Sequence, residues 1–532
     1  MTRGNQRDLA REKNLKKLQE QKKRAGANAK DGNAGLSTDS RMNRDAEIMR
    51  IKQEKAAAKK AAEDAAKGSD SGKVAKYEIN SYRIPKAFLR HAIRMSSPES
   101  LATQLAEFRD KFAELHPESS EEDECCAVRQ RAVQFIRAEI PAIDEHAVPV
   151  TKAAYFLACG RLLNVSHCFD PVAEVLLSSA VKLDPLLHDA WFELGQCLTK
   201  KPDIEFAVSC FEESIRLQKS GNVMSAMAVA LRSQASRCES DAEKTALRTK
   251  ALTLAREAVV INPTSGNGYL ALATGCFVEF FSSSQTKFPF LDESIKYYGK
   301  ALQCPDQTRN PELHLNFATA LRYREDFGSA LQHLKEAVKL DPRDSLNSRQ
   351  RLTALVNYLE KFSDAVEKKG RLKMKRLQTL VAALQASTCA FIQSSEAKNS
   401  LAVATKSIDD LQIGPNLNTI IHAKIVATIP HDDIVPLTFV VCDVNERCCA
   451  VTVYNCAPNF GFVIGDTIDI AEPFLKEAEN IELSTSCDAT TSPTRAIPLL
   501  RWIRVRSPRL LCRNGQPTAS AVVAPTQLTI ES

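Results

Sequence analysis

A pattern of large and small residues recurs from about residue 150 onward, and it constrains the fold more than any other feature of this chain. In the clearest copy the patterned residues are Trp191, Leu194, Gly195, Leu198, Ala207, Phe211 and Ser214. With Trp191 at position 4 of a unit of about 34 residues, the others fall at positions 7, 8, 11, 20, 24 and 27. Small residues at three of these positions allow two antiparallel helices to approach closely, and the large residues fill the space between them. The pattern predicts a helix–turn–helix unit.

Other copies keep the second half of the pattern. Their residues at positions 20, 24, 27 and 32 are Ala173, Leu177, Ala180 and Pro185, then Ala251, Ala255, Ala258 and Pro263, then Ala330, Leu334, Ala337 and Pro342, with a weaker copy from Tyr269 to Ala301. Proline cannot continue a helix, so each proline is expected to stop its unit. About five units result, and two of them are stretched by insertions, around 237–248 and 279–290. These are the marks of tetratricopeptide repeats, which stack into a solenoid whose concave face binds extended peptides.

The segments outside the repeats differ in composition. Residues 1–76 contain no Phe, Trp or Tyr, which predicts a disordered basic segment. Residues 77–149 are expected to form N-terminal helices, with a solvated acidic loop at 118–124. The repeat solenoid with a capping helix is expected over 150–385 and a linker over 386–415.

The period changes to that of strands near residue 419. Runs such as IIHAKIVATI and CCAVTVYN are rich in Val, Ile and Thr and are separated by turn residues. Five or six short strands over 416–530 predict a small β-barrel. The expected fold class is therefore mainly α, a helical solenoid followed by a small all-β barrel.

The basic charge of the chain belongs to its N-terminal segment. Residues 1–70 hold 18 Lys and Arg against 11 Asp and Glu, a balance of +7, whereas the rest holds 53 against 54. Such asymmetry indicates an acidic partner or nucleic acid for this segment. No apolar run is long enough to span a bilayer, so no membrane partner is expected.

No catalytic constellation, cofactor site or metal site is predicted. The sequence contains no phosphate-binding glycine loop, GxSxG or HExxH motif, so we expect a protein that is not an enzyme. The 16 cysteines include no CxxC pair, and the His residues lack zinc-ligand spacing. The thiols are interpreted as reduced core residues.

Two basic features are candidate binding sites. Arg232 follows the helical run VMSAMAVAL in the third repeat; it is either an exposed residue at a helix end or a groove residue that pairs with an acidic peptide side chain. Positions that form a carboxylate clamp in chaperone adaptors instead hold pairs such as Leu157 with Arg161, which argues against that ligand. Residues 368–376, KKGRLKMKR, carry six positive charges and are either a solvated helix end or a contact for a polyanion.

Several ordered stretches resemble the tetratricopeptide repeat protein 5 family over about 77–530. They include Trp191 to Gly195, Asn310 to Asn316, Lys369 to Gln378, Val453-Tyr454-Asn455 and Asn514 to Pro517. The resemblance implies that the C-terminal barrel is an OB fold. By position it implies that Arg232 contacts the acidic residue of a bound tubulin peptide, and that Lys373, Lys375 and Arg376 lie in the ribosomal RNA contact. A long loop at 474–500 and the repeat insertions depart from the family pattern.

Residues 1–60 resemble the small EDRK-rich factor family through Arg3 to Arg11, Lys13-Asn14 and Arg44 to Met49. That resemblance implies a disordered segment that binds acidic or aggregation-prone proteins or RNA. A genuine fusion, or two neighbouring genes joined into one reading frame, would each explain a chain with both resemblances.

The function implied by the longer resemblance has two versions. In the first, the chain is a peptide-binding adaptor that recognises the N-terminal motif of nascent tubulin at the ribosome and recruits mRNA-decay factors. In the alternative, it is a nuclear coactivator scaffold that links a histone acetyltransferase to stress-response transcription factors. These expectations place the protein in the cytoplasm and the nucleus.

Overall fold

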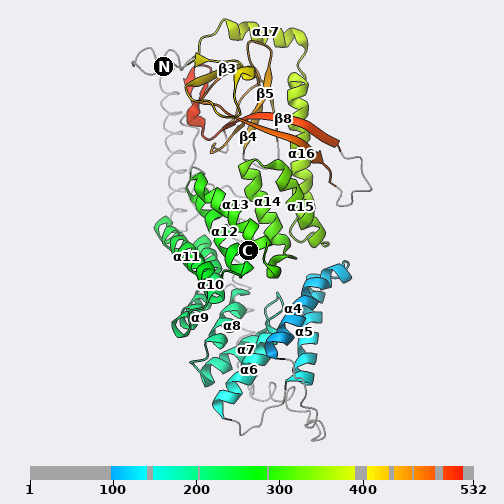
Figure 1. The fold of residues 1–532 in the computed structure, drawn as a ribbon, viewed down its shortest axis with the longest axis vertical. Helices are drawn as coiled ribbons and strands as arrows, with labels where there is room; N and C mark the ends of the chain where they lie inside the picture. Colours follow the sequence, from blue (N-terminus) through cyan, green and yellow to red (C-terminus); the bar gives the residue numbers. More distant parts are fainter. Residues whose placement is uncertain are drawn as a thin grey trace, which may run out of the picture. The chain divides into compact units, whose positions relative to one another are not determined.

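The computed structural model describes residues 97–140, 148–201, 204–283, 287–389, 404–430, 436–457, 460–485 and 495–518. All of them belong to one compact unit, Met95–Ser532 (Figure 1). The predicted disordered segment 1–76 lies outside the described residues, as does the start of the predicted 77–149 region.

Five antiparallel helix pairs form the repeat array, as the sequence pattern predicts. They are α6 (Pro149–Leu163) with α7 (Pro171–Leu183), α8 (His188–Thr199) with α9 (Ile204–Leu217), α10 (Gly221–Arg237) with α11 (Asp241–Ile261), α12 (Gly266–Ser282) with α13 (Phe288–Leu302), and α14 (Pro311–Arg324) with α15 (Phe327–Leu340). Figure 1 shows the pairs stacked in chain order. The predicted helical solenoid is therefore confirmed.

The second repeat shows how the patterned residues produce this packing. Phe211 of α9 is fully buried against Gly195 of α8, where a Cβ atom would lie only 2.6 Å from the phenyl ring. Trp191 donates its indole N–H to the carbonyl of Pro185, at 2.9 Å, which ties the helix to the turn before it. Leu194 and Ala207 are buried in the same helix pair. Glycine is required at position 195 because α8 and the ring of Phe211 lie too close together to leave room for a side chain.

The repeat prolines lie just outside helices. Pro185, Pro263 and Pro342 each follow a helix by two residues, after α7, α11 and α15 respectively. In each case the intervening residue donates its backbone N–H to the carbonyl four positions earlier and completes the last turn. The prolines then prevent continuation, because they have no N–H to donate.

Two helices precede the repeats, α4 (Pro98–Leu115) and α5 (Glu121–Glu139). The prediction of a solvated loop at 118–124 is wrong for its second half, because Ser120 and Asp123 form a capping box that starts α5. Glu124 is buried, and its carboxylate lies 2.6 Å from the guanidinium of Arg343, beyond α15. The acidic run thus begins a helix, where negative charge is favoured, and joins it to the last repeat.

The cysteine interpretation also needs correction. Cys125 of α5 and Cys168 of the α6–α7 turn form a disulfide. The remaining described cysteines are free, and most are buried. The pair escaped sequence analysis because its partners are 43 residues apart and belong to no recognisable spacing motif.

After the repeats, α16 (Ser348–Glu367) and α17 (Met374–Gln385) lead into a single β-sheet. Its strands are β1 (Ala404–Thr405), β2 (Gly414–Pro415), β3 (Thr419–Thr428), β4 (Leu437–Cys442), β5 (Cys448–Val453), β6 (Thr467–Ala471), β7 (Phe474–Leu483), β8 (Arg495–Val505), β9 (Leu511–Arg513) and β10 (Gln516–Pro517). The strand order is β10-β9-β6-β3-β4-β5-β8-β7-β2, and β1 also pairs with β3. Among the described ladders, β1–β3 and β5–β8 are parallel, and the rest are antiparallel.

Two differences from the predicted boundaries follow. β1 and β2 fall inside 386–415, so the sheet begins within the range that the sequence assigned to a linker. The expected loop at 474–500 is largely the β7–β8 hairpin, the most extended pairing in the sheet. Charged residues interrupt the apolar residues of β7, where Lys476, Glu477, Glu479 and Glu482 lie within ten residues, so a regular strand pattern does not stand out in the sequence.

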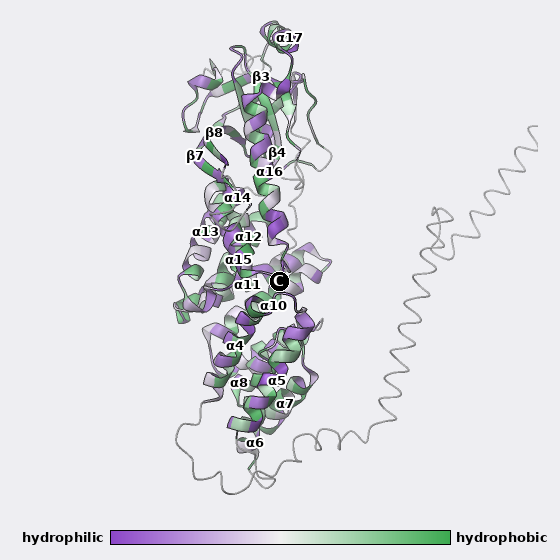
Figure 2. Ribbon diagram, turned by 90° about the vertical axis from the view of Figure 1, so that its right-hand side faces the viewer, coloured by the Kyte–Doolittle hydropathy of each residue, from purple (hydrophilic) through white to green (hydrophobic). Residues whose placement is uncertain are grey.

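Both faces of the central strands are buried. In β4, Phe439 and Val441 face an internal core, whereas Val440 and Cys442 belong to the core that the sheet shares with the last repeats. Figure 2 shows apolar stretches running through β3, β4 and α16. Strands buried on both faces read as continuous apolar runs, which is how the sequence presents them.

An aromatic cluster joins the sheet to the repeats. Trp502 of β8 is fully buried, with its ring centroid 5.3 Å from that of Phe327 and 6.2 Å from that of Phe362. Tyr358 of α16 adds a hydrogen bond of 3.0 Å to Thr438 of β4. One continuous core therefore extends from α12 to β8, and the sheet is not an independent appendage.

A buried ion cluster crosses the same junction. Glu325 ends α14 in a left-handed conformation, and its carboxylate lies 3.1 Å from Arg504 and 3.5 Å from Lys476. The same carboxylate accepts hydrogen bonds from Thr452, at 2.7 Å, and Tyr454, at 2.9 Å. Burial alone would raise the pKa of Glu325, but Arg504 and then Lys476 outweigh burial and lower it. The carboxylate is therefore held charged inside the junction.

Candidate peptide groove and basic turn

Arg232 lies among the first helices of repeats three to five. It sits in the last third of α10, and its Nη1 donates to the carbonyl of Ala271 in α12, at 3.1 Å. Glu312 at the start of α14 and Tyr298 of α13 both influence its charge. Arg232 therefore lies where the first helices of repeats three and four meet. The alternative of an exposed residue at the helix end does not describe it, since α10 continues to Arg237 and Arg232 is half-buried.

The electrostatics of Arg232 favour an anionic partner. Burial lowers the pKa of Arg232 to about 10, against opposing contributions from Tyr298 and Glu312. No ion pair between described residues includes Arg232. A partly desolvated guanidinium without a close carboxylate can bind one strongly, because its planar fork donates two parallel hydrogen bonds.

Glu312 is an acidic residue whose charge raises the pKa of Arg232, against the effect of burial. Burial raises the pKa of Glu312, while Asn316 and then Arg232 lower it by smaller amounts. The two charges therefore influence each other's pKa, although no ion pair between described residues joins Arg232 to Glu312. The family resemblance includes Asn310 to Asn316 but implies no role for Glu312. Its signal was a carboxylate at the first turn of a groove helix.

Arg161, which stands at one of the clamp positions named above, forms ion pairs within the protein. Its guanidinium lies 2.8 Å from Glu193, 3.0 Å from Glu99 and 3.6 Å from Asp189. Glu193 is buried, and it also accepts a hydrogen bond from Asn164. Arg161 thus joins α4, α6 and α8 at the start of the array.

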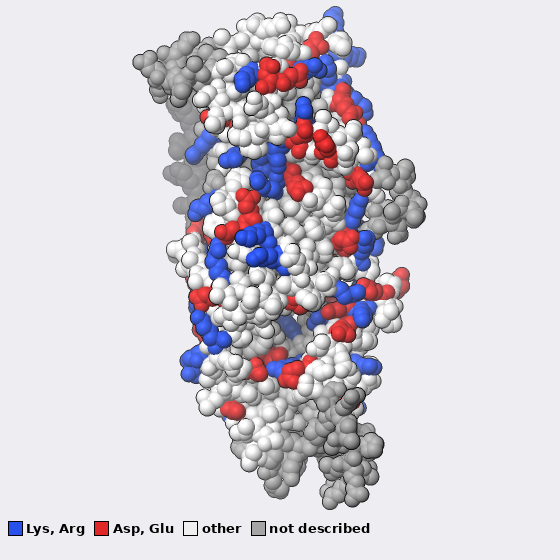
Figure 3. Space-filling model, in the orientation of Figure 1, with Lys and Arg blue, Asp and Glu red and all other residues white. Residues whose placement is uncertain are grey.

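The basic run 368–376 divides into two groups in the structure. Lys368 and Arg371 pair with Asp364, at 2.6 and 3.2 Å, and Lys369 pairs with Glu446, at 3.5 Å. The other three, Lys373, Lys375 and Arg376, are exposed at the beginning of α17, and no ion pair between described residues includes them. Figure 3 shows blue side chains at the α17 end of this face. These three residues, which form no ion pair with another described residue, are the ones for which the family resemblance implies RNA contact.

The turn that carries these residues has an unusual backbone. Lys369, Gly370 and Arg371 have consecutive positive φ values of 46°, 67° and 56°. A Cβ atom at Gly370 would lie 2.4 Å from the carbonyl oxygen of Val426 in β3. Left-handed conformation costs a non-glycine residue about 1–2 kcal/mol, so the contact with β3 must hold this turn in place. The basic start of α17 is consequently presented from a fixed position on the sheet.

The sheet offers few aromatic faces to a nucleic acid. Phe439, Tyr454, Phe462 and Trp502 are buried, and Phe460 is partly buried. Single-strand binding by OB folds uses exposed aromatic rings on which bases stack. For these five aromatic residues the structure therefore favours packing over base stacking.

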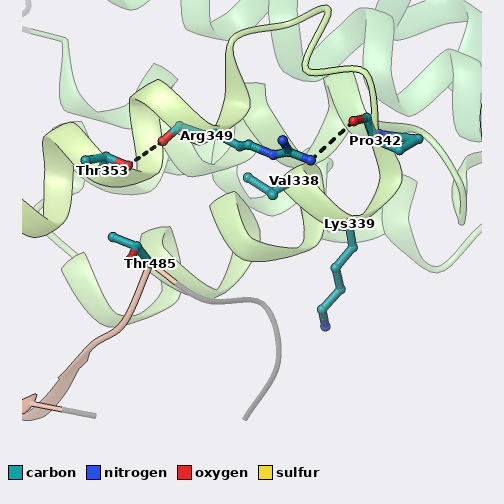
Figure 4. A pocket seen from close by; sticks show the side chains of 6 residues that line it. All are labelled: Val338, Lys339, Pro342, Arg349, Thr353 and Thr485. Carbon is teal, nitrogen blue, oxygen red and sulfur yellow. Dashed lines mark hydrogen bonds between the residues drawn. The ribbon is translucent and has the colours of Figure 1, made fainter. Parts of the chain in front are cut away.

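A separate pocket of about 470 Å³ lies between α15, α16 and the end of β7 (Figure 4). Its lining residues are Val338, Lys339, Pro342, Arg349, Thr353 and Thr485. Arg349 donates to the carbonyl of Pro342, at 3.2 Å, so the guanidinium is partly engaged in closing the α15–α16 connection. The pocket shares no residue with the groove around Arg232 or with the basic turn.

Fold and site together define a class: a tetratricopeptide-repeat adaptor for protein interactions, with a β domain fused to its last repeats. The family model described as "Tetratricopeptide repeat protein 5 OB fold domain" matches residues 402–527. Tetratricopeptide repeat protein 5 of Homo sapiens is 30% identical over 431 residues, covering 80% of this chain and 93% of the relative. The Mus musculus relative is 29% identical over 441 residues, covering 80% and 95%. The chain belongs to the tetratricopeptide repeat protein 5 family, and its C-terminal sheet is an OB domain.

The N-terminal segment has its own relatives. The family model described as "Small EDRK-rich factor 1/2-like, N-terminal" matches residues 1–43. "Modifier of protein aggregation 4" of Caenorhabditis elegans is 73% identical over 78 residues, covering 15% of this chain and 95% of that protein. Human small EDRK-rich factor 2 is 52% identical over 60 residues, covering 11% and 93%. Both predicted resemblances are confirmed.

Solved structures similar to the chain include repeat proteins. A thermophilic tetratricopeptide-repeat protein from Thermus thermophilus is 17% identical, with a TM-score of 0.30, covering 39% of this chain and 97% of its own. The APC/C hetero-tetramer Cut9–Hcn1 is 13% identical, with a TM-score of 0.34, covering 49% and 46%. No helix in the described part of the chain is long and apolar enough to cross a membrane.

Proposed function

We propose that this adaptor recognises the N-terminal Met-Arg-Glu motif of nascent tubulin at the ribosome and promotes decay of tubulin mRNA. The observation that carries the proposal is the half-buried Arg232 in the repeat groove, which has no carboxylate partner among the described ion pairs. A peptide glutamate supplies the missing charge. Family membership supports the same reading, because it rests on a match across most of the chain.

The groove proposal predicts that Arg232→Ala weakens binding of a fluorescently labelled Met-Arg-Glu-Ile peptide by about 10-fold or more. A charge-assisted hydrogen bond is worth about 1.5–3 kcal/mol, which corresponds to this range. Fluorescence anisotropy with the full chain measures the effect. Arg216→Ala is the matched control, because Arg216 is exposed on a second helix and, among the described residues, its ion pair is with Glu213 one turn earlier.

A second peptide makes this assay specific for the proposed pair. Replacing the peptide glutamate by glutamine should weaken wild-type binding but leave binding to the Arg232→Ala protein nearly unchanged. In such a double-mutant cycle the difference isolates the pairwise interaction. If wild-type protein binds both peptides equally well, the guanidinium does not read the acidic residue and the proposal fails.

The basic turn is proposed to contact ribosomal RNA. Replacing Lys373, Lys375 and Arg376 together with alanine should weaken ribosome co-sedimentation and reduce the slope of log affinity against log salt by about 2–3, since each of the three lost phosphate contacts removes about 0.7–0.9. A control with the same change in net charge replaces Arg216, Lys219 and Lys250, which are exposed on the repeats and paired with glutamates. An equal loss in both proteins would show that only total charge matters.

The remaining proposed features follow from the family and from composition. The basic segment over 1–60 is assigned acidic or aggregation-prone protein partners or RNA, in keeping with its excess of positive charge. Action at ribosomes places the protein in the cytoplasm. The alternative, a nuclear coactivator scaffold, gains no support from the described OB domain, because Phe439, Tyr454, Phe462 and Trp502 are buried and offer no ring faces for DNA bases to stack on. A groove that rejects Met-Arg-Glu-Ile while the folded chain binds a transcription-factor peptide would favour that alternative.

A further inference from the structure

A cluster of metal-binding side chains lies on the outer face of the OB sheet, away from the groove and the basic turn. In β3 the inner face is formed by Ile421 and Ala423, so His422 between them points outward. In β6 the same alternation places Asp469 outward between Ile468 and Ile470. Both outward side chains are nonetheless buried, at 9% and 2% exposure. They are covered by residues that follow α17, among them Ser387 and Cys389.

Strand register brings the polar residues into one row. His422 is directly opposite Asp469 across β3 and β6, and Asp469 is directly opposite Cys512 across β6 and β9. Residues directly opposite in antiparallel strands have Cβ atoms about 4.5–5.5 Å apart on the same face. Three strands thus present an imidazole, a carboxylate and a thiol side by side.

Cys389 is a further member of this cluster, and it comes from outside the sheet. It follows α17 by four residues and is 5% exposed. One ligand atom each from Cys389, His422 and Asp469 lies within 4.8 Å of the other two. The three come from a helix connection and two strands, at sequence separations of 33 and 47 residues. Spacing motifs therefore gave no sign of the cluster.

The imidazole is already held in a defined orientation. Its Nδ1 lies 2.5 Å from a carboxylate oxygen of Asp469, and its Nε2 lies 2.9 Å from the hydroxyl of Ser387. The Ser387 hydroxyl also donates to the carbonyl of Leu384, at 2.7 Å, in the last turn of α17. A histidine fixed in this way needs little reorganisation to become a ligand.

We propose that Cys389, His422 and Asp469 bind a zinc ion that fastens the end of α17 to the OB sheet, with Cys512 the adjacent candidate for a fourth ligand. Thiolate and imidazole together select zinc over magnesium or calcium, which prefer oxygen ligands only. Tetrahedral zinc keeps its ligand atoms about 3.3–3.8 Å apart, given bonds of about 2.0–2.3 Å. On binding, Asp469 would therefore exchange its hydrogen bond with Nδ1 for a bond to the metal, and the sulfur of Cys389 would move inward.

The proposed ion gives the buried cluster a structural purpose. A buried carboxylate is costly unless it is balanced by positive charge or hydrogen bonds, and Asp469 lies against an imidazole and beside thiols. A zinc ion would balance the carboxylate and deprotonated thiol and would link three segments distant in sequence. Because α17 begins with Lys373, Lys375 and Arg376, the same ion would stabilise the helix that presents the basic residues.

The test measures metal bound to the full chain, purified without an affinity tag that binds metal. Mass spectrometry of the metal content should give about one zinc ion per chain. Cys389→Ser and His422→Gln should each lower zinc affinity by on the order of 10-fold or more, because even the loss of an outer-shell partner costs about that much. Cys456→Ser is the control, since Cys456 is a buried thiol of the same domain outside the cluster.

A second measurement needs no variant to fold. Cobalt loaded into wild-type protein should show sulfur-to-cobalt charge-transfer absorption and the visible bands of a tetrahedral ion. Chelation should lower the melting temperature of wild-type protein and should have a smaller effect on Cys389→Ser. Wild-type protein that takes up neither zinc nor cobalt would overturn the proposal, as would zinc affinity that is unchanged in Cys389→Ser.

Discussion

Replacing Glu325 with glutamine should lower the free energy of unfolding by about 3–5 kcal/mol, the cost of breaking a buried ion pair from one side. The carboxylate is fully surrounded at the junction and faces Arg504, at 3.1 Å, and Lys476, at 3.5 Å. Glutamine can keep hydrogen bonds to Thr452 and Tyr454 but cannot balance the charge. Burial already lowers the pKa of Lys476 to about 8, so the lysine can release its proton at modest cost. Arg504 cannot, and it is left as an uncompensated buried cation.

Trp502 provides the readout, because it is buried at the same junction. Urea unfolding followed by tryptophan emission, in a Trp191→Phe background, reports the junction alone. Glu257→Gln is the matched control: its pair with Lys219 is exposed on both sides, and such pairs contribute about 0–1 kcal/mol. Equal destabilisation by the two changes would contradict the assignment of Glu325 as the electrostatic link between repeats and OB domain.

The same residue makes a pH prediction with a defined sign. The pKa of Glu325 is lower in the folded protein than its usual 4.5. Its contribution to stability is therefore present above the unfolded pKa and is lost as the pH falls through the folded pKa. Glu325→Gln should accordingly remove part of the acid sensitivity of the wild-type protein in the window below pH 4.5.

The repeats could be predicted in detail because each repeat is encoded locally. Large and small positions in the second repeat fix which helix faces meet, and prolines mark where helices stop. The family resemblance was equally accessible, since it rests on residues in order along the chain. Lys373 and Arg376 could be named for the same reason, although only the structure shows that the other basic residues of the turn are neutralised by Asp364 and Glu446.

The junction and the cluster on the sheet could not be predicted, because their members have no local pattern. Glu325 reads as an ordinary acidic residue at a helix end, and it is buried only because β5 and β8 pack against it. His422 and Asp469 alternate with apolar residues, as outward polar residues do in any half-exposed strand. Their burial depends on where α17 and its connection lie, which strand periodicity does not determine.

The largest effect within the repeats is expected at Phe211, where truncation to alanine should cost about 3–5 kcal/mol. The ring is fully buried between α8 and α9 and fills the space that Gly195 leaves open. Gly195→Ala should also destabilise the protein, by about 1–3 kcal/mol, because its new methyl group would lie 2.6 Å from the ring. Far-ultraviolet circular dichroism during chemical unfolding measures both losses.

The two changes together should cost less than Phe211→Ala alone. Without the ring, the methyl group at position 195 meets an empty space and fills part of the cavity. Alanine also favours a helix over glycine by about 1 kcal/mol, so the effect of Gly195→Ala should reverse sign in the Phe211→Ala protein. Gly299 supplies the control, since a Cβ there has no atom within 4 Å and Gly299→Ala should be equally mild in both backgrounds. Simple additivity at Gly195 would show that the helices relax apart, and that the glycine is not kept small by contact with Phe211.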